Sequence, residues 1–259
     1  MISLHCLGTA GYHPSSSRHT SAFFVPDWGI LLDAGTGIFR LPPLIRHDRI
    51  DLLLSHAHLD HTFGLTALLD IVHQRPLDSF HVWGLRKHLS GVREHLLHPT
   101  IFPAQLPITW HPVDDCGEVL NLPFAKVTLR EQTHPGGSVA YRIEGTRPRG
   151  TLVYATDTQG DPSQAFADFA GRADLLIHEC NFSDAFESLA RQTGHTHTSC
   201  LAQIAAAAAP VQLLVTHFNP LDASEQPIDV RVVAKHYPGT IRLAKDEMVV
   251  TFADFESTP

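Results

Sequence analysis

Leu52-Leu53-Leu54-Ser55-His56-Ala57-His58-Leu59-Asp60-His61 is the segment of this chain that says most about its structure and its chemistry. An apolar run typical of a buried strand leads directly into three histidines and one aspartate. In an extended or tightly turned segment, residues i and i+2 point the same way, so His56 and His58 can share one metal ion. Asp60 and His61, beyond the turn, then face a second ion. The motif therefore predicts two neighbouring metal sites.

Three further residues of ligand type follow apolar runs or precede turns elsewhere in the chain. His134 precedes Pro135 and two glycines, Asp157 ends the run 152–157, and His217 ends the run 213–217. A carboxylate such as Asp157 can bridge two cations at a spacing of roughly 3.5–4 Å, which lets a hydroxide sit between them. These positions supply the ligands that two sites still need.

The composition favours metal binding over nucleic-acid or membrane binding. The chain has 259 residues, a formal net charge of −8 and 19 histidines. An acidic chain has no overall positive field to attract a polyanion, and histidine is a common ligand of transition metals. The cysteines form no disulfide framework, the N-terminus has no features of a signal peptide, and no apolar run reaches the roughly 20 residues that span a bilayer. We therefore expect a cytoplasmic protein with no membrane segment.

Short apolar runs alternate with turns and helical stretches along the whole chain, which predicts an α/β (α+β) protein. Because sheets with two apolar faces must bury both, we expect two sheets packed face to face under helices, in one domain over 1–259. The proline-containing interval 98–112 is expected to be an irregular excursion that forms a rim or lid. The expected strands are 2–7, 22–25, 29–32, 51–54, 80–83, 127–129, 140–143, 151–154, 175–177, 212–215 and 248–252. The expected helices are 62–73, 86–97, 162–171, 184–192, 198–209 and 225–236.

The order of these ligand-type residues resembles the signature of the metallo-β-lactamase-fold hydrolases. The matching pattern is His56-x-His58-x-Asp60-His61, followed by His134, Asp157 and His217. The resemblance covers nearly the whole chain and implies a four-layer αββα sandwich with the metals at one edge. It further implies a first ion held by His56, His58 and His134, a second held by Asp60, His61 and His217, and a bridging Asp157. Asp33 resembles the aspartate of the family's first motif, which supports the metal loop by hydrogen bonding rather than by ligation.

Further segments are similar to ribonuclease Z and its phosphodiesterase relatives. They are the N-terminal runs 7–11 and 17–21, the His178-Glu179-Cys180 segment and the Gly194-His195-Thr196-His197-Thr198 segment. The resemblance implies that Glu179 orients His195, which faces the reacting group. An imidazole held by a carboxylate is suited to stabilise an oxyanion or to protonate a leaving alkoxide. His197 is the alternative acid and a candidate substrate contact.

The chain departs from ribonuclease Z at positions that bear on the substrate. The interval from His134 to Asp157 is too short for the arm that grips transfer RNA, and Asn219-Pro220 stands where those enzymes continue with Ser-x-Arg-Tyr. The chain is therefore more similar to the smaller phosphodiesterases of the superfamily, including those that act on cyclic phosphates. Arg18, with Ser17, is a candidate phosphate contact because a guanidinium binds phosphate bidentately; a solvated surface arginine is the alternative reading.

We predict a hydrolase that cleaves a small or cyclic phosphodiester with a hydroxide bridging two divalent ions. Zinc is the first expectation, and manganese or iron accept the same donors. We expect Asp60, Glu179 and His195 to act in catalysis on a small-molecule substrate, with no nucleic-acid or membrane partner and with a homodimer as the assembly that relatives often form. The alternatives are hydrolysis of a carboxylic ester, lactone or sulfate ester, tRNA 3′ processing, and a metal-binding regulatory module without activity.

Overall fold

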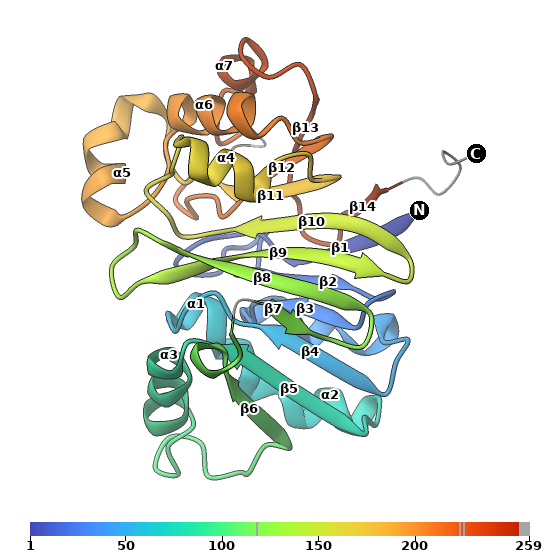
Figure 1. Cartoon of the computed structure of the whole chain (residues 1–259). Coiled ribbons are helices and arrows are strands. Elements are labelled where there is room, and N and C mark those ends of the chain that lie inside the picture. The colour runs from blue at the N-terminus through green and yellow to red at the C-terminus, as the bar shows by residue number, and fades with distance from the viewer. Residues whose placement is uncertain (118, 223, 225, 254–259) are drawn as a thin grey trace.

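Two seven-stranded sheets lie against each other at the centre of the molecule, with helices on both outer sides (Figure 1). The computed structural model describes residues 1–117, 119–222, 224 and 226–253, so parts of the domain expected over 1–259 lie outside the described residues. In spatial order, the first sheet contains β14 (Val249–Phe252), β1 (Ile2–Gly8), β2 (Ala22–Val25), β3 (Ile30–Leu32), β4 (Arg49–Leu53), β5 (Ser79–Gly84) and β6 (Ile108–Pro112). The second contains β13 (Thr240–Leu243), β12 (Gln212–Thr216), β11 (Leu175–Glu179), β10 (Arg149–Ala155), β9 (Ser138–Thr146), β8 (Ala125–Gln132) and β7 (Val119–Asn121).

Each sheet changes from antiparallel pairing on one side to parallel pairing on the other. β3 to β6 are parallel neighbours in the first sheet, and β10 to β13 are parallel neighbours in the second. Parallel strands place their carboxyl ends at one edge, which is where open α/β sheets bind ligands. Asp33, His56, Asp157 and His217 each follow the end of such a strand. The topology therefore collects these residues from distant parts of the sequence.

The helices form the two outer layers. Figure 1 shows α1, α2 and α3 on the side of the first sheet and α4 to α7 on the side of the second. The α-helices are α1 (Leu59–Thr62), α2 (Leu68–Gln74), α3 (Arg86–Gly91), α4 (Gln164–Ala170), α5 (Glu187–Thr193), α6 (Thr198–Ala208) and α7 (Val230–Ala234). Short 3₁₀ helices cover Thr36–Arg40, Pro42–Leu44, Phe63–Ala67, Val113–Asp115 and Asp184–Phe186, and a π-helical turn covers Val92–Leu96. Among the described residues, none of the helices combines the length and apolar character that a membrane crossing requires.

The core explains why the end of β4 and the residue that follows it carry consecutive apolar side chains, Leu52 to Leu54, without alternation. Leu53 packs in the cluster between the two sheets, whereas Leu52 and Leu54 pack in the cluster beneath the helices of the first sheet. Successive side chains of a strand point to opposite faces, so a strand covered on both faces is apolar at every position. The end of β4 is therefore rigidly held where the histidines begin.

The predicted four-layer αββα sandwich is confirmed, and every predicted strand overlaps an observed one. Three strands were not predicted, namely β6, β7 and β13. The expectation of an irregular excursion over 98–112 is wrong at its end, because Ile108–Pro112 pairs in parallel with β5. Hydrogen bonding along that edge outweighs the prolines, which lie outside the strand or at its last position.

The helix predicted over 62–73 is divided into α1, the 3₁₀ turn Phe63–Ala67 and α2. The Gly64 N–H donates to Ala34 O at 2.8 Å, which ties this turn to the loop after β3. The helix predicted over 86–97 becomes α3 and a π-helical turn. The helix predicted over 225–236 is observed only as α7, and position 225 lies outside the described residues.

Candidate metal centre

Seven histidine and aspartate side chains from both sheets meet at the carboxyl ends of the strands. They are His56 and His58 after β4, Asp60 and His61 in α1, His134 after β8, Asp157 after β10 and His217 after β12. Their nitrogen and oxygen atoms form two groups, and within each group the atoms lie within 4.8 Å of one another. The first group contains His56, His58, His134 and Asp157, and the second contains Asp60, His61, Asp157 and His217. These are the two sets that the resemblance implies, with Asp157 common to both.

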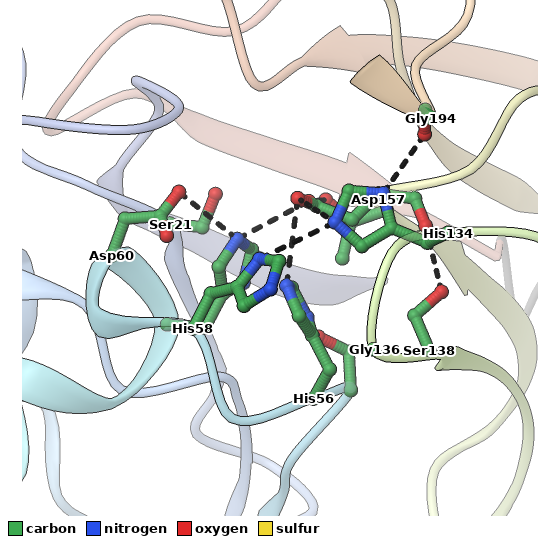
Figure 2. A network of polar contacts seen from close by, with 12 residues as sticks. Ser21, His56, His58, Asp60, His134, Gly136, Ser138, Asp157 and Gly194 are labelled. Carbon is green, nitrogen blue, oxygen red and sulfur yellow. Dashed lines mark hydrogen bonds and ion pairs between the residues drawn. The ribbon is translucent and has the colours of Figure 1, made fainter. Parts of the chain in front are cut away.

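Asp157 directs one carboxylate oxygen to each group. Its Oδ2 lies 3.6 Å from His56 Nε2 and 3.5 Å from His134 Nε2. Its Oδ1 lies 3.2 Å from His61 Nε2 and 3.0 Å from His217 Nε2. Figure 2 shows the rings of His56, His58 and His134 gathered around this carboxylate. A carboxylate with this arrangement could bridge two cations, one near each group.

Three of the imidazoles are anchored through Nδ1, which leaves Nε2 directed at Asp157. His61 Nδ1 donates to Asp33 Oδ2 at 2.7 Å, and His134 Nδ1 donates to Gly194 O at 2.9 Å. His56 Nδ1 lies 3.0 Å from Ser55 Oγ, whose hydroxyl donates to Asp33 Oδ2 at 2.7 Å. Hydrogen bonds of this kind fix the tautomer of a metal-binding histidine and the direction of its lone pair.

The centre fits divalent cations because its buried acceptors face one another. With Nδ1 protonated toward Ser55, His56 Nε2 carries a lone pair, and this atom is buried without a hydrogen-bond partner. It faces a carboxylate oxygen, also an acceptor, at 3.6 Å. Two acceptors in that position are satisfied by a cation placed between them. Imidazole nitrogens and carboxylate oxygens are donors that zinc, manganese and iron accept.

The electrostatics of the cluster leave most of these ligands in the protonation state that metal binding requires. Burial lowers the pKa of His56, His58 and His134, so their rings are neutral. Burial alone would raise the pKa of Asp157, but the neighbouring imidazoles hold it well below its usual range. His61 is the exception, because three carboxylates raise its pKa well above the usual value despite burial. Metal binding must displace a proton from His61.

Asp33 lies behind the cluster and does not join either group. Its Oδ1 accepts the Ser55 N–H at 2.7 Å, and its Oδ2 accepts the Tyr154 hydroxyl at 2.7 Å in addition to Ser55 and His61. The carboxylate is completely buried. It therefore ties the loop after β4 to β10 of the opposite sheet, across the interface between the two halves of the molecule.

Three of the strand-end residues adopt a left-handed backbone. The φ angles of Asp33, Asp157 and His217 are +54°, +48° and +59°. Residues other than glycine rarely adopt this region, and such conformations cluster at functional sites. The turn that each residue makes aims its side chain across the end of its sheet.

Glu179 and His195 form a second polar pair beside the two groups. Glu179 Oε1 accepts from His195 Nδ1 at 2.9 Å and from the Thr158 N–H at 2.8 Å, and Oε2 accepts from the Thr196 N–H at 3.2 Å. The His195 ring stacks on His217 with the ring centroids 5.3 Å apart. Burial lowers the pKa of His195, but the Glu179 carboxylate and its hydrogen bond raise it to about 9.

The other predicted site residues, Arg18, Ser17 and His197, do not line the cavity beside the seven ligand-type side chains. His197 Nδ1 donates to Asp184 Oδ1 at 2.8 Å, at the start of α6. Arg18 donates from Nη1 to Thr9 Oγ1 and Ala244 O, both at 2.6 Å, and lies over the Phe218 ring. Ser17 is exposed. The structure thus directs His195 toward the cluster and gives Arg18 and His197 contacts within the protein.

Sequence reasoning missed three residues that shape the centre. The Tyr12 N–H donates to Asp60 Oδ2 at 2.7 Å, and the Asn181 side-chain amide lies 3.3 Å from His217 Nδ1. A Cβ on Gly11 would lie 2.4 Å from His217 Cε1, so only glycine fits there without displacement. Gly11 lies in the run 7–11 that resembles ribonuclease Z, but its contact with His217, like those of Tyr12 and Asn181, joins segments far apart in the chain, so the local sequence does not predict it.

Comparison with known proteins gives matches over most of the chain. The family described as Beta-lactamase superfamily domain matches residues 29–218. Zinc phosphodiesterase ELAC protein 2 of Macaca fascicularis is 27% identical over 98% of this chain, which spans about a third (33%) of that relative's length. Ribonuclease Z of Prochlorococcus marinus (strain MIT 9313) is 27% identical, with 98% of this chain and 97% of that protein covered. The crystal structure of the metallo-beta-lactamase fold protein YhfI from Bacillus subtilis has a TM-score of 0.78 at 20% identity, with 97% of this chain and 100% of that chain covered.

Proposed function

The chain belongs to the beta-lactamase superfamily, and we propose that it hydrolyses a small or cyclic phosphodiester. The chain is a metal-dependent hydrolase of this family. One observation carries the finer proposal: Asp157 directs an oxygen to each of two ligand groups, and His195, held by Glu179, lines the same cavity. A relative that matches 98% of the chain is named a zinc phosphodiesterase, which supports a phosphodiester as the bond that is cleaved.

We assign the two sites as the geometry groups them. His56, His58 and His134 would hold one ion, Asp60, His61 and His217 would hold the other, and Asp157 would bridge them. When bound, the two ions act as Lewis acids and lower the pKa of water from about 15.7 toward 7. We propose zinc, because the relative's name supports it and histidine-rich sites suit it. Manganese or iron are the alternatives.

We assign to His195 the role of donating a proton to the oxygen of the leaving group. Its Nδ1 is occupied by Glu179, so Nε2 is the atom that remains to donate a proton. With its pKa raised, the ring is protonated at neutral pH, the state that a general acid needs. Glu179 is itself fixed by two backbone N–H groups, so the imidazole is held in one orientation.

The proposal is tested with zinc-loaded protein and three chromogenic substrates. We expect turnover of bis(4-nitrophenyl) phosphate and no comparable turnover of 4-nitrophenyl acetate or 4-nitrophenyl sulfate. An Asp157→Asn variant, which weakens the bridging ligand, serves as the control for adventitious hydrolysis. The reverse preference would assign the site to a carboxylic or sulfate ester and overturn the proposal.

A second candidate is tRNA 3′ processing, which the ribonuclease Z relative favours. Against it, the segment between His134 and Asp157 is occupied by the β9–β10 hairpin, whose strands pair from Tyr141 to Thr146. Incubation with a precursor tRNA distinguishes the two. Specific cleavage at the 3′ end, with poor turnover of small phosphodiesters, would make this candidate the function.

A further inference from the structure

Apart from the candidate ligands, His195 and Thr193, the cavity at the metal centre is lined mainly by apolar and aromatic side chains. It has a volume of about 620 Å³. Beside the ligand residues and His195, its lining consists of Tyr12, Ala57, Leu59, Pro135 and Thr193. None of these is a lysine or arginine, so apart from His195, which is assigned to the leaving group, the walls offer no cationic side chain for a second phosphate. A bound phosphodiester must place its substituents against aliphatic and aromatic surface.

Tyr12 occupies an unusual position in that wall. Its φ angle is +61°, a conformation that bulky residues rarely adopt, and its side chain is 80% exposed. Its backbone N–H holds Asp60 Oδ2, and the preceding Gly11 lies against the His217 ring. The backbone at Gly11 and Tyr12 is therefore held against the candidate metal ligands Asp60 and His217, while the Tyr12 ring beside them is exposed. Strained conformations at such places are typical of functional residues.

A second apolar element flanks the same cavity. Leu59, the first residue of α1, is 63% exposed and lines the cavity, and Phe63, the first residue of the following 3₁₀ turn, is 50% exposed. Large apolar side chains left exposed together beside a cavity mark a binding surface.

We propose that Tyr12 is a specificity-determining residue that stacks against a flat aromatic substituent of the phosphodiester substrate, with Leu59 beside it. The inference rests on the proposed function and deepens it, because it names the substrate class: a phosphodiester of a single negative charge that carries an aromatic ring. Diphosphates and polynucleotides, which bring further charges, find no lysine or arginine in the walls of this cavity, and His195 is already assigned to the leaving group.

The test compares two stable ligands of equal charge that differ only in the ring, monomethyl phenylphosphonate and monomethyl methylphosphonate. Their dissociation constants are measured by calorimetry on zinc-loaded wild type and on Tyr12→Ala, Tyr12→Phe and Val211→Ala variants. Val211 is 60% exposed and precedes β12, at the end of the strand opposite His217, so its variant controls for loss of an exposed apolar side chain. All four proteins are also assayed with bis(4-nitrophenyl) phosphate.

We expect the wild type to bind the phenyl compound more tightly than the methyl compound, and Tyr12→Ala to reduce that preference by roughly 3- to 10-fold. Tyr12→Phe and Val211→Ala should preserve the preference, and Tyr12→Ala should retain its zinc, since the backbone N–H to Asp60 remains. Turnover of the diester with an unchanged preference in Tyr12→Ala would overturn this inference alone. Absence of both turnover and phosphonate binding in the zinc-loaded wild type would overturn the proposed function, and the inference with it.

Discussion

At the level of single residues, the proposed function gives Asp157 and His195 different roles, in metal binding and in the chemical step. Asp157 contacts the imidazoles of both ligand groups, whereas His195 contacts Glu179 and stacks beside His217 without belonging to either group. Changes at Asp157 should therefore alter metal binding, and changes at His195 should alter the chemical step.

Replacing His195 separates these roles. We expect His195→Ala to lower kcat by roughly 10²–10⁴-fold, the usual contribution of a general acid, while the metal content per chain stays the same. His197→Ala is the matched control, because His197 contacts Asp184 and does not line the cavity. Loss of activity in the control with retention in His195→Ala would assign the acid to His197 instead.

The pH dependence of the reaction tests Glu179. The carboxylate raises the pKa of His195, so removing its charge lowers that pKa. A general acid must be protonated, so activity falls as the pH rises through its pKa. In Glu179→Gln the alkaline decline of kcat should therefore begin at lower pH than in the wild type. Glu187→Gln removes an exposed carboxylate of α5 and should leave the profile in place; identical profiles for Glu179→Gln and the wild type would remove Glu179 from this role.

The sequence identifies the seven ligand-type residues but not the contacts that orient them. A histidine cluster after an apolar run is visible locally, whereas the Tyr154 hydroxyl reaches Asp33 across the two sheets. Likewise, nothing in the sequence near Tyr12 or Asn181 indicates that they touch Asp60 and His217. Such contacts depend on how distant strands are placed, and only the folded chain shows them.

At the scale of elements, the sheet edges explain which strands sequence reasoning missed. β6, β7 and β13 are all edge strands, and their residues are mostly half-buried or exposed. An edge strand has one neighbour and incomplete cover, so it needs no continuous apolar run. The strands inside the sheets, such as β4, carry that run and are predictable. The remaining edge, β14, has alternating burial and was also predicted.

The packing of the turn before α2 gives a stability prediction. A Cβ on Gly64 would lie 2.0 Å from Gly35 O, in contact with rigid backbone of the loop after β3. We expect Gly64→Ala to lower the free energy of unfolding by about 1–3 kcal/mol, as overpacking does. Gly91→Ala is the control, since no atom lies within 4 Å of a Cβ there and alanine favours a helix. Urea denaturation measures both, and equal stability of the two variants would contradict the packing described.

At the scale of the whole molecule, the candidate centre joins the two sheets. Its ligands follow β4 on one side and β8, β10 and β12 on the other, and Asp33 and Tyr154 make a further link between the halves. The overall αββα arrangement was predictable because alternating strands and helices allow few layered solutions. Candidate ligand side chains from both sheets face one another at this centre, so bound cations should stabilise the packing of the two sheets.

Removal of metal should therefore destabilise the whole fold. A ligand present at 1,000 times its dissociation constant stabilises the folded state by about 4 kcal/mol. For a chain of this size, that corresponds to a fall in Tm of about 8–16 °C on chelation. Thermal unfolding with and without chelator, followed by addition of zinc, measures the change. A Tm that does not respond to chelation in zinc-loaded protein would show that the centre does not hold the sheets together.

The number of metal ions bound per chain tests the proposed two-metal centre. Elemental analysis of protein purified with zinc should give two ions per chain in the wild type and about one in His56→Ala or His217→Ala, which each lack a ligand of one group. Wild-type protein without bound ions, or variants that retain both ions, would contradict the two-metal centre.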